Sequence, residues 1–161
     1  MNGPVEPPVE PPAGPAAGPA LPTARSGRVK AARRLLRHPA RAERRLFLAE
    51  GPQAVREALG VPGCVREVFA TSAAAGAHPE LVAACRAGEV TWQVVEDAAL
   101  VSLTQTVTPQ GVVAVCSFVD VDLSAVLDPG ARLLALCVEV RDPGNAGTVI
   151  RCADAAGADA V

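Results

Sequence analysis

Short apolar runs alternate with amphipathic stretches along residues 46–119, and this alternation restricts the fold more than any other feature of the sequence. The runs that we expect as strands are residues 46–49, 65–70, 91–95 and 111–119. Apolar residues at helical spacing mark the stretches between them, residues 53–59, 79–87 and 97–103. Such alternation predicts an α/β sandwich around a largely parallel or mixed sheet. The last run is apolar at almost every residue, which predicts a strand buried on both faces. Asp97 is expected to cap the helix that starts there.

A strongly basic segment precedes this alternation. Nine of the fifteen Lys and Arg residues lie between residues 25 and 45, where Glu43 is the only acid, so the segment carries +8 and the rest of the chain −10. We expect Ser26 to cap a helix that buries one apolar stripe over residues 29–36, and Pro39 to end it. Such charge asymmetry indicates a contact with nucleic acid, although a charge run can also be a solvated helix face. The candidate contacts are Arg25, Arg28, Lys30, Arg33, Arg34, Arg37, Arg41, Arg44 and Arg45.

Aromatic residues and cysteines exclude several other kinds of site. The chain has three Phe, one Trp and no Tyr, too few for a platform that stacks bases, so an RNA contact should run through phosphates. The five cysteines form no Cys-x-x-Cys pair, and with two histidines they predict no metal site. Each cysteine lies in an apolar stretch, so we expect buried, reduced thiols and a cytoplasmic protein. No apolar run is long enough to span a membrane, and the N-terminus lacks the pattern of a secretory signal.

The composition divides the chain into four parts. Residues 1–24 hold eight of the fifteen prolines, which predicts a disordered tail, with a proline-rich ligand for a partner as the alternative. Residues 25–120 form the expected α/β domain, and the turn-rich residues 121–131 a linker. Residues 132–161 contain one strand–turn–helix unit, whose expected strand is 133–140. One such unit cannot bury both of its faces, so the chain looks cut partway into a second domain.

The turn of that last unit carries the one constellation suited to chemistry, residues 142–151. Pro143-Gly144 makes the turn, and Asn145 is placed to accept from the free amides of the helix. Gly147 leaves the first turn bare, so a phosphate or ribose can approach the helix N-terminus. Arg151 offers a guanidinium that can hold a phosphate bidentately. The alternative is a capped surface helix with Arg151 paired to Asp154 or to the carbonyl region of Ala155.

Three strings resemble the TrmH/SpoU branch of the SPOUT RNA methyltransferases. Residues 142–161 (DPGNAGTVIRCADAAGADAV) resemble the first motif of its methyltransferase domain. Residues 47–59 (FLAEGPQAVREAL) and 108–115 (TPQGVVAV) resemble the opening and the close of its substrate-binding domain. The three motifs occur in the family's order, which makes the match specific.

This resemblance implies a fold and an activity. Residues 25–120 would form an L30e-like α/β/α sandwich that binds rRNA or tRNA, and residues 132–161 would begin the knotted, Rossmann-like SPOUT domain. Family members are homodimers that transfer a methyl group from S-adenosylmethionine to a ribose 2′-hydroxyl. By resemblance, Arg151 would engage the target nucleotide and help to activate its hydroxyl, and Asn145 would hold the loop and the arginine in place.

The resemblance is incomplete. The second and third motifs of the family, which form the knot and cradle the methyl donor, have no counterpart before Val161. We therefore expect a fragment of a longer enzyme that is inactive alone and has no cofactor-binding residue of its own. The alternative is a non-catalytic L30e-like RNA-binding module with a βα extension. The strand–turn–helix unit favours the enzyme, because a pure binding module has no use for it.

Overall fold

The computed structural model describes residues 20–127 and 130–161, which divide into two compact units. The first unit ends at Phe118, and the second runs from Val119 to Val161. Residues 1–19 of the expected proline-rich tail lie outside the described residues, as do residues 128 and 129 of the expected linker. The first unit contains the sheet, whereas the described part of the second consists of two helices and irregular segments.

A four-stranded mixed sheet forms the centre of the first unit, in the order β1–β4–β2–β3. Its strands are β1 (Leu46–Glu50), β2 (Val65–Ala70), β3 (Thr91–Val94) and β4 (Val112–Ser117). β4 pairs antiparallel with both β1 and β2, whereas β2 and β3 run parallel. The expected α/β class and mixed sheet are confirmed, and each strand expected in this unit forms.

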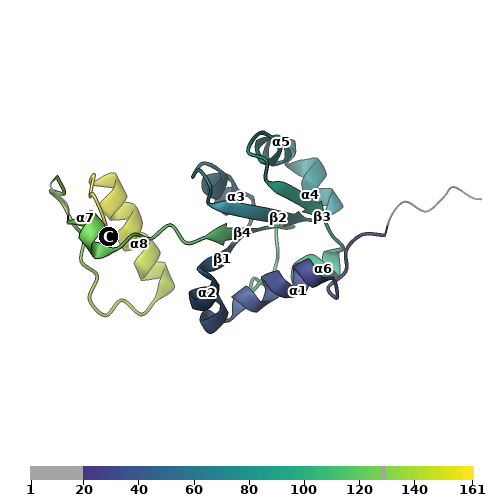
Figure 1. Ribbon diagram of the computed structural model, residues 1–161, viewed down its shortest axis with the longest axis horizontal. Helices are drawn as coiled ribbons and strands as arrows, with labels where there is room; N and C mark the ends of the chain where they lie inside the picture. The colour runs from purple at the N-terminus through teal and green to yellow at the C-terminus, as the bar shows by residue number, and fades with distance from the viewer. Residues whose placement is uncertain (1–19, 128–129) are drawn as a thin grey trace, which may run out of the picture. The chain divides into compact units, whose positions relative to one another are not determined.

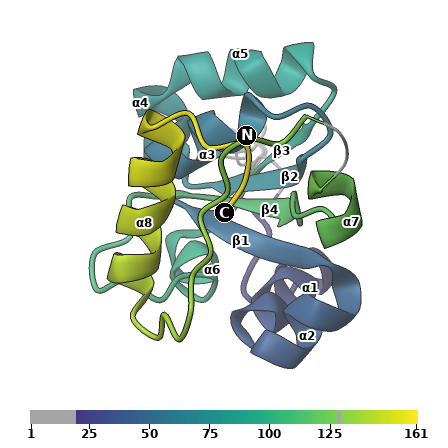
Figure 2. The ribbon, with the colours of Figure 1, turned by 90° about the vertical axis from the view of Figure 1, so that its left-hand side faces the viewer.

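Helices cover both faces of this sheet (Figure 1). One face carries α3 (Pro52–Leu59), α4 (Ser72–Ala77) and α5 (Pro79–Ala87). The other carries α1 (Gly27–Arg33), the 3₁₀ helix η1 (Arg34–Leu36), α2 (His38–Arg44) and α6 (Asp97–Val101). Figure 2 shows the same two helical layers from the side, with β1, β2, β3 and β4 between them.

Successive residues of a strand point to opposite faces, and this alternation supplies two cores. On β2, Val68 packs into the core under α3 and α5, and Phe69 packs into the core against the basic segment. The expected apolar stripe of that segment fills the second core, where Val29 and Leu35 are buried. Burial of this stripe fixes α1 and η1 on the sheet and leaves their basic side chains to solvent.

The helix ends differ from the expected ones in three places. Ser26 occupies the N-cap position of α1, but its hydroxyl caps no amide. Glu96, not Asp97, occupies the N-cap position of α6, because the helix includes Asp97 as its first residue. Pro39 does not end the first helix: the chain leaves η1 at Arg37, which is extended, and Pro39 opens α2. Proline suits the first helical turn, since its missing N–H has no partner there anyway.

The strand expected at residues 133–140 is wrong. In the second unit, α7 (Leu123–Val126) and α8 (Pro143–Ala155) form, but the segment between them makes one isolated bridge, Leu134 with Ala160. Leu136 and Val138 are each 83% exposed. A strand needs neighbours that take its backbone hydrogen bonds, and the described residues of this unit supply only that bridge. Asp159 holds the start of the segment by accepting the N–H groups of Arg132 and Leu133, which lowers the pKa of its carboxyl.

The expectation that each cysteine is buried is right for three of the five. Cys64, Cys85 and Cys116 are buried, whereas Cys137 and Cys152 are exposed. Cys137 belongs to the segment that forms no strand. Burial, together with the neighbouring Cys64 thiol, raises the pKa of Cys116 to about 12, and burial also raises the pKa of Cys85.

Thiol reactivity should follow this division. Since the thiolate is the reactive form, iodoacetamide at neutral pH should modify Cys137 and Cys152 at least about tenfold faster than Cys85 and Cys116. Peptide mass spectrometry on the native protein measures the rates, and the protein unfolded in urea is the control in which all five should react. Equal rates in the native protein would contradict the burial of Cys85 and Cys116.

Glu67 is an acid on the buried middle of β2. Its side chain is 20% exposed, and the Arg28 Nε lies 3.5 Å from its Oε2 atom, which accepts no hydrogen bond from the described residues. Burial raises the pKa of Glu67, and the Arg28 charge only partly offsets the effect. The folded state therefore holds this proton more tightly than the unfolded state does. Stability should fall as the pH rises from about the ordinary Glu value through the raised pKa.

Glu67→Gln removes that ionisation and should lessen this loss of stability. Urea unfolding followed across the acid-to-neutral range should show a smaller fall for the variant than for the wild type. Glu57→Gln, on the exposed face of α3, serves as the matched control. A pH dependence that Glu67→Gln leaves unchanged would show that another group carries it.

Candidate functional site

Four of the nine candidate RNA contacts surround one hollow of about 560 Å³. These are Lys30 and Arg33 of α1, Arg34 of η1, and Arg37 just after it, with Leu36 as the apolar part of the wall. All four cations are exposed, and none forms an ion pair with an acid within the described residues. Four uncompensated positive charges around one depression attract phosphate groups.

Two other candidates, Arg28 and Arg41, have partners on the same face of the first unit. Arg28 reaches Glu67 and, at 3.5 Å, the side-chain oxygen of Gln93. The Arg41 Nη1 atom donates to the carbonyl oxygens of Leu35 and Leu36, both at 3.1 Å. These contacts fix α1 and α2 in place, so Arg28 and Arg41 have a structural role that the sequence did not reveal.

The remaining three candidates lie outside the lining of the hollow. Arg25 and Arg44 are exposed at the start and the end of the basic segment. Arg45 has a left-handed backbone, and its guanidinium carbon lies 4.8 Å from the centre of the Phe118 ring. The structure thus gathers four of the nine residues and separates the other five.

The expected turn and helix form at residues 142–155, but Asn145 does not cap the helix. Asp142 is the N-cap residue of α8, and its carboxylate accepts the backbone N–H of Asn145 at 2.8 Å. An aspartate directly before Pro-Gly at a helix start is a cap signal that could have identified this role. Asn145 therefore takes part in the cap through its backbone and leaves its amide side chain exposed.

Arg151 lies along α8 toward the N-terminus of that helix. Its Nη2 atom donates to the Thr148 hydroxyl at 3.3 Å, and that hydroxyl donates to the Gly144 carbonyl at 2.9 Å. A Cβ at position 147 would lie 3.2 Å from Nη1, so Gly147 leaves the room that the guanidinium uses. No ion pair with Asp154 forms within the described residues. Thr148 was missed in the sequence, although its spacing of three residues from Arg151 is the signal for such a contact.

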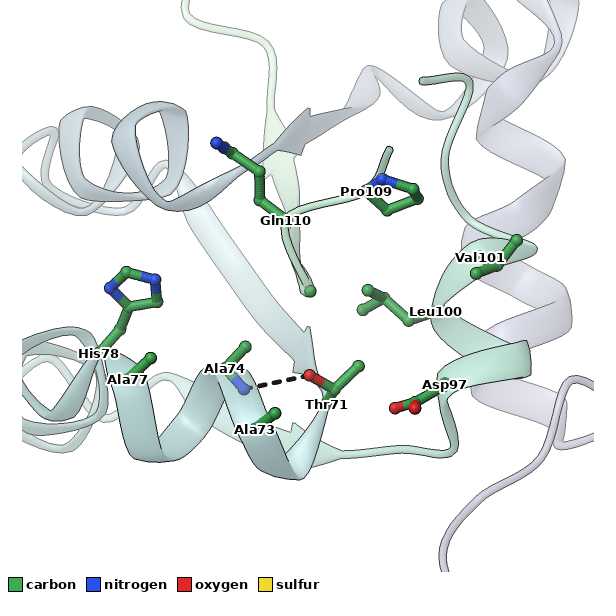
Figure 3. A pocket seen from close by; sticks show the side chains of 11 residues that line it. Thr71, Ala73, Ala74, Ala77, His78, Asp97, Leu100, Val101, Pro109 and Gln110 are labelled. Atoms are coloured by element: carbon green, nitrogen blue, oxygen red, sulfur yellow. Dashed lines mark hydrogen bonds between the residues drawn. The ribbon is translucent and has the colours of Figure 1, made fainter. Parts of the chain in front are cut away.

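A second hollow, of about 490 Å³, lies between α4 and α6 (Figure 3). Alanines, Leu100 and Val101 make up much of its wall. The Thr71 hydroxyl in this wall accepts the Ala74 N–H at 3.1 Å and so caps α4, a helix that the sequence did not predict. His78 lies 3.5 Å from Glu80, whose pKa is lowered by its own backbone N–H, by Arg56 and by His78. Glu80 is not part of the wall, and the two titratable residues that are, His78 and Asp97, lie on opposite sides of the hollow (Figure 3).

Within residues 20–127 and 130–161, no three His, Cys, Asp or Glu side chains come close enough to hold a metal ion. None of the helices in the described part of the chain is long and apolar enough to cross a bilayer.

Comparison with known proteins gives consistent matches. The family model for RNA 2′-O ribose methyltransferase substrate binding matches residues 48–120. The 23S rRNA (guanosine(2553)-2′-O)-methyltransferase RlmP of Bacillus subtilis is 36% identical over 139 residues, which are 86% of this chain and 52% of RlmP. The chain thus spans about half the length of this curated relative.

Two solved structures resemble the chain along most of its length. The rRNA methyltransferase from Sinorhizobium meliloti is 30% identical, with a TM-score of 0.67 over 84% of this chain and 51% of that one. The SpoU methyltransferase AviRb from Streptomyces viridochromogenes, in complex with the cofactor AdoMet, is 27% identical, with a TM-score of 0.66 over 84% of this chain and 51% of that one. Sequence and fold agree, and both resemble the SpoU/TrmH family of RNA 2′-O-methyltransferases.

Proposed function

We propose that this chain is part of an RNA 2′-O-ribose methyltransferase that acts on rRNA or tRNA. The observation that carries the proposal is the hollow of four unpaired cations on a domain that matches the substrate-binding model of these enzymes. Because the chain covers 52% of RlmP, the activity belongs to a protein of the relatives' full length. The comparisons favour this function over that of a non-catalytic RNA-binding module.

We assign the two units to the two parts of such an enzyme. Residues 25–120 are the L30e-like RNA-binding domain, which the three-layer arrangement around the mixed sheet supports. Residues 121–131 are the linker, and residues 132–161 begin the SPOUT methyltransferase domain, which the likeness to AviRb over 84% of the chain supports. The family resemblance also supports a homodimer for the full-length protein and a cytoplasmic location.

RNA is held through its phosphates in this proposal. Lys30, Arg33, Arg34 and Arg37 carry full positive charges at the rim of one hollow and are not neutralised by nearby acids in the described residues. Such contacts supply affinity with little discrimination between sequences. Arg25, Arg44 and Arg45 extend the positive surface along the basic segment, whereas Arg28 and Arg41 chiefly stabilise the domain.

Arg151 is the proposed catalytic residue and Asn145 its companion in the turn. A ribose 2′-hydroxyl is a poor nucleophile, and a fixed cation beside it stabilises the oxyanion charge that develops as its proton leaves. The contact with Thr148, and through it with Gly144, restrains the Arg151 guanidinium near the start of α8. The exposed Asn145 side chain lies on the first turn of the same helix, where it can position the ribose or the arginine.

S-adenosylmethionine is the proposed methyl donor, and when bound it supplies the transferred methyl group. The described residues of the second unit do not form a site for it. Leu136 and Val138, on the segment before the turn, are each 83% exposed and enclose no cradle.

Reversing one charge of the hollow should weaken RNA binding. Arg33→Glu should lower the affinity for a labelled rRNA fragment by about tenfold at low salt, and it should reduce the slope of log K against log salt by about one. Arg86→Glu, which changes an exposed arginine on α5, across the sheet from the hollow, is the matched control. Filter binding at several salt concentrations measures both quantities. Equal effects of the two variants would place the RNA contact elsewhere.

Arg151→Ala should separate catalysis from binding. In the protein at the full length of its relatives, loss of one electrostatic group at the reacting ribose should reduce 2′-O-methyl transfer by on the order of 10²–10³-fold. RNA affinity should change little, because the basic segment supplies most of it. Arg132→Ala, in the same unit, is the control. Methyl transfer near the wild-type rate in Arg151→Ala would show that Arg151 is a surface residue without a catalytic role.

A further inference from the structure

We call the hollow lined by Lys30, Arg33, Arg34 and Arg37 the basic hollow. A third hollow, of about 250 Å³, shares one residue with it. Leu36 lies in the wall of both. The other apolar residues in the wall of the third hollow are Leu35, Phe47, Leu48 and Leu103, and its polar groups are Arg41, Glu50 and Gln105. Apolar side chains together with a few polar groups that fix orientation are the usual lining of a site for a small molecule or group.

The loop that forms one side of this hollow is held at three points. The Glu50 carboxylate accepts the backbone N–H of Gln105 and the hydroxyl of Thr106. At the start of the loop, the Thr104 hydroxyl donates to the Val101 carbonyl at 3.0 Å. Just after the end of the loop, the Gly111 carbonyl accepts the Thr71 N–H at 2.9 Å. The polar side chains of this loop, residues 104–110, are therefore displayed on a restrained backbone.

Gln105 is the residue of this loop that lines the third hollow. Its backbone N–H is used by Glu50, but its side-chain amide is exposed and makes no hydrogen bond within the described residues. An amide offers both a donor and an acceptor, the pattern that matches the edge of a nucleobase. Arg41 also lines the hollow, and its Nη1 is held by the Leu35 and Leu36 carbonyls, which orients the guanidinium.

We propose that this third hollow receives one unstacked nucleotide base of an RNA strand whose phosphates lie on Lys30, Arg33, Arg34 and Arg37. The inference rests on the proposed RNA-binding function and adds to it the place where a base is bound. Charge complementarity selects the occupant, because the four cations that adjoin the hollow favour a polyanion over an acyl chain or an apolar peptide. Single-stranded RNA can turn a base out of its stack, whereas duplex RNA holds its bases inside.

The proposal predicts that the chain prefers single-stranded RNA and that Gln105 carries part of this preference. Gln105→Ala should weaken binding of a mixed-sequence single-stranded oligoribonucleotide by about three- to tenfold, the worth of one or two hydrogen bonds. The slope of affinity against salt should stay unchanged, because no charge is altered. Binding of a duplex of the same length should not respond.

Gln110→Ala is the matched control, since it removes the same side chain from the same loop but outside this hollow. Thermal melts show whether both variants fold; we expect wild-type stability because both side chains are exposed. Equal affinity of the wild type for single strand and duplex, or equal effects of the two variants, would overturn the base site and leave RNA binding intact. Absence of binding to either RNA would instead refute the proposed function, and the base site with it.

Discussion

The antiparallel pairing of β4 with both β1 and β2 is the interaction on which the first unit depends. β4 is buried at five consecutive residues, Val112–Cys116, and each helical layer packs against one of its faces. At its N-terminal end, Gly51 donates to the Val112 carbonyl and Thr71 to the Gly111 carbonyl, both at 2.9 Å. The turns after β1 and β2 are thereby tied to the loop that precedes β4. Gly111 permits this approach, because its φ is +78° and a Cβ there would lie 2.9 Å from Thr71 Oγ1.

Much of this unit could be predicted from the sequence, because its signals are local. The strand 65–70 and the helix 79–87 form at the expected residues, since apolar periodicity and a leading proline mark them directly. The helix over 72–77 was missed, because its alanines and glycine form no apolar stripe. The strand predicted over 133–140 does not form, and here the local signal misleads. Its apolar pattern is strong, but a strand also needs partners, which a local pattern does not reveal.

The candidate site was less accessible to sequence reasoning, because its key contacts join distant residues. Charge alone identified nine basic side chains but could not show that Arg28 meets Glu67 across the sheet face or that Arg41 turns back onto η1. The N-cap of α8 involves only nearby residues, but the sequence favours Asn145 where the structure has Asp142, since either residue type suits the N-cap position. The roles of Arg151 and Asn145 in catalysis stay predictions.

The contacts of the Arg41 guanidinium also affect how the basic hollow binds RNA. By donating to the last two carbonyls of η1, it joins α1, η1 and α2 into one stiff corner. The backbone that bears Lys30, Arg33, Arg34 and Arg37 is then ordered before any RNA arrives. Binding to a preorganised surface forfeits less conformational entropy than binding to a flexible basic arm. In this way Arg41 would raise the affinity for RNA by ordering four other cations, without a phosphate contact of its own.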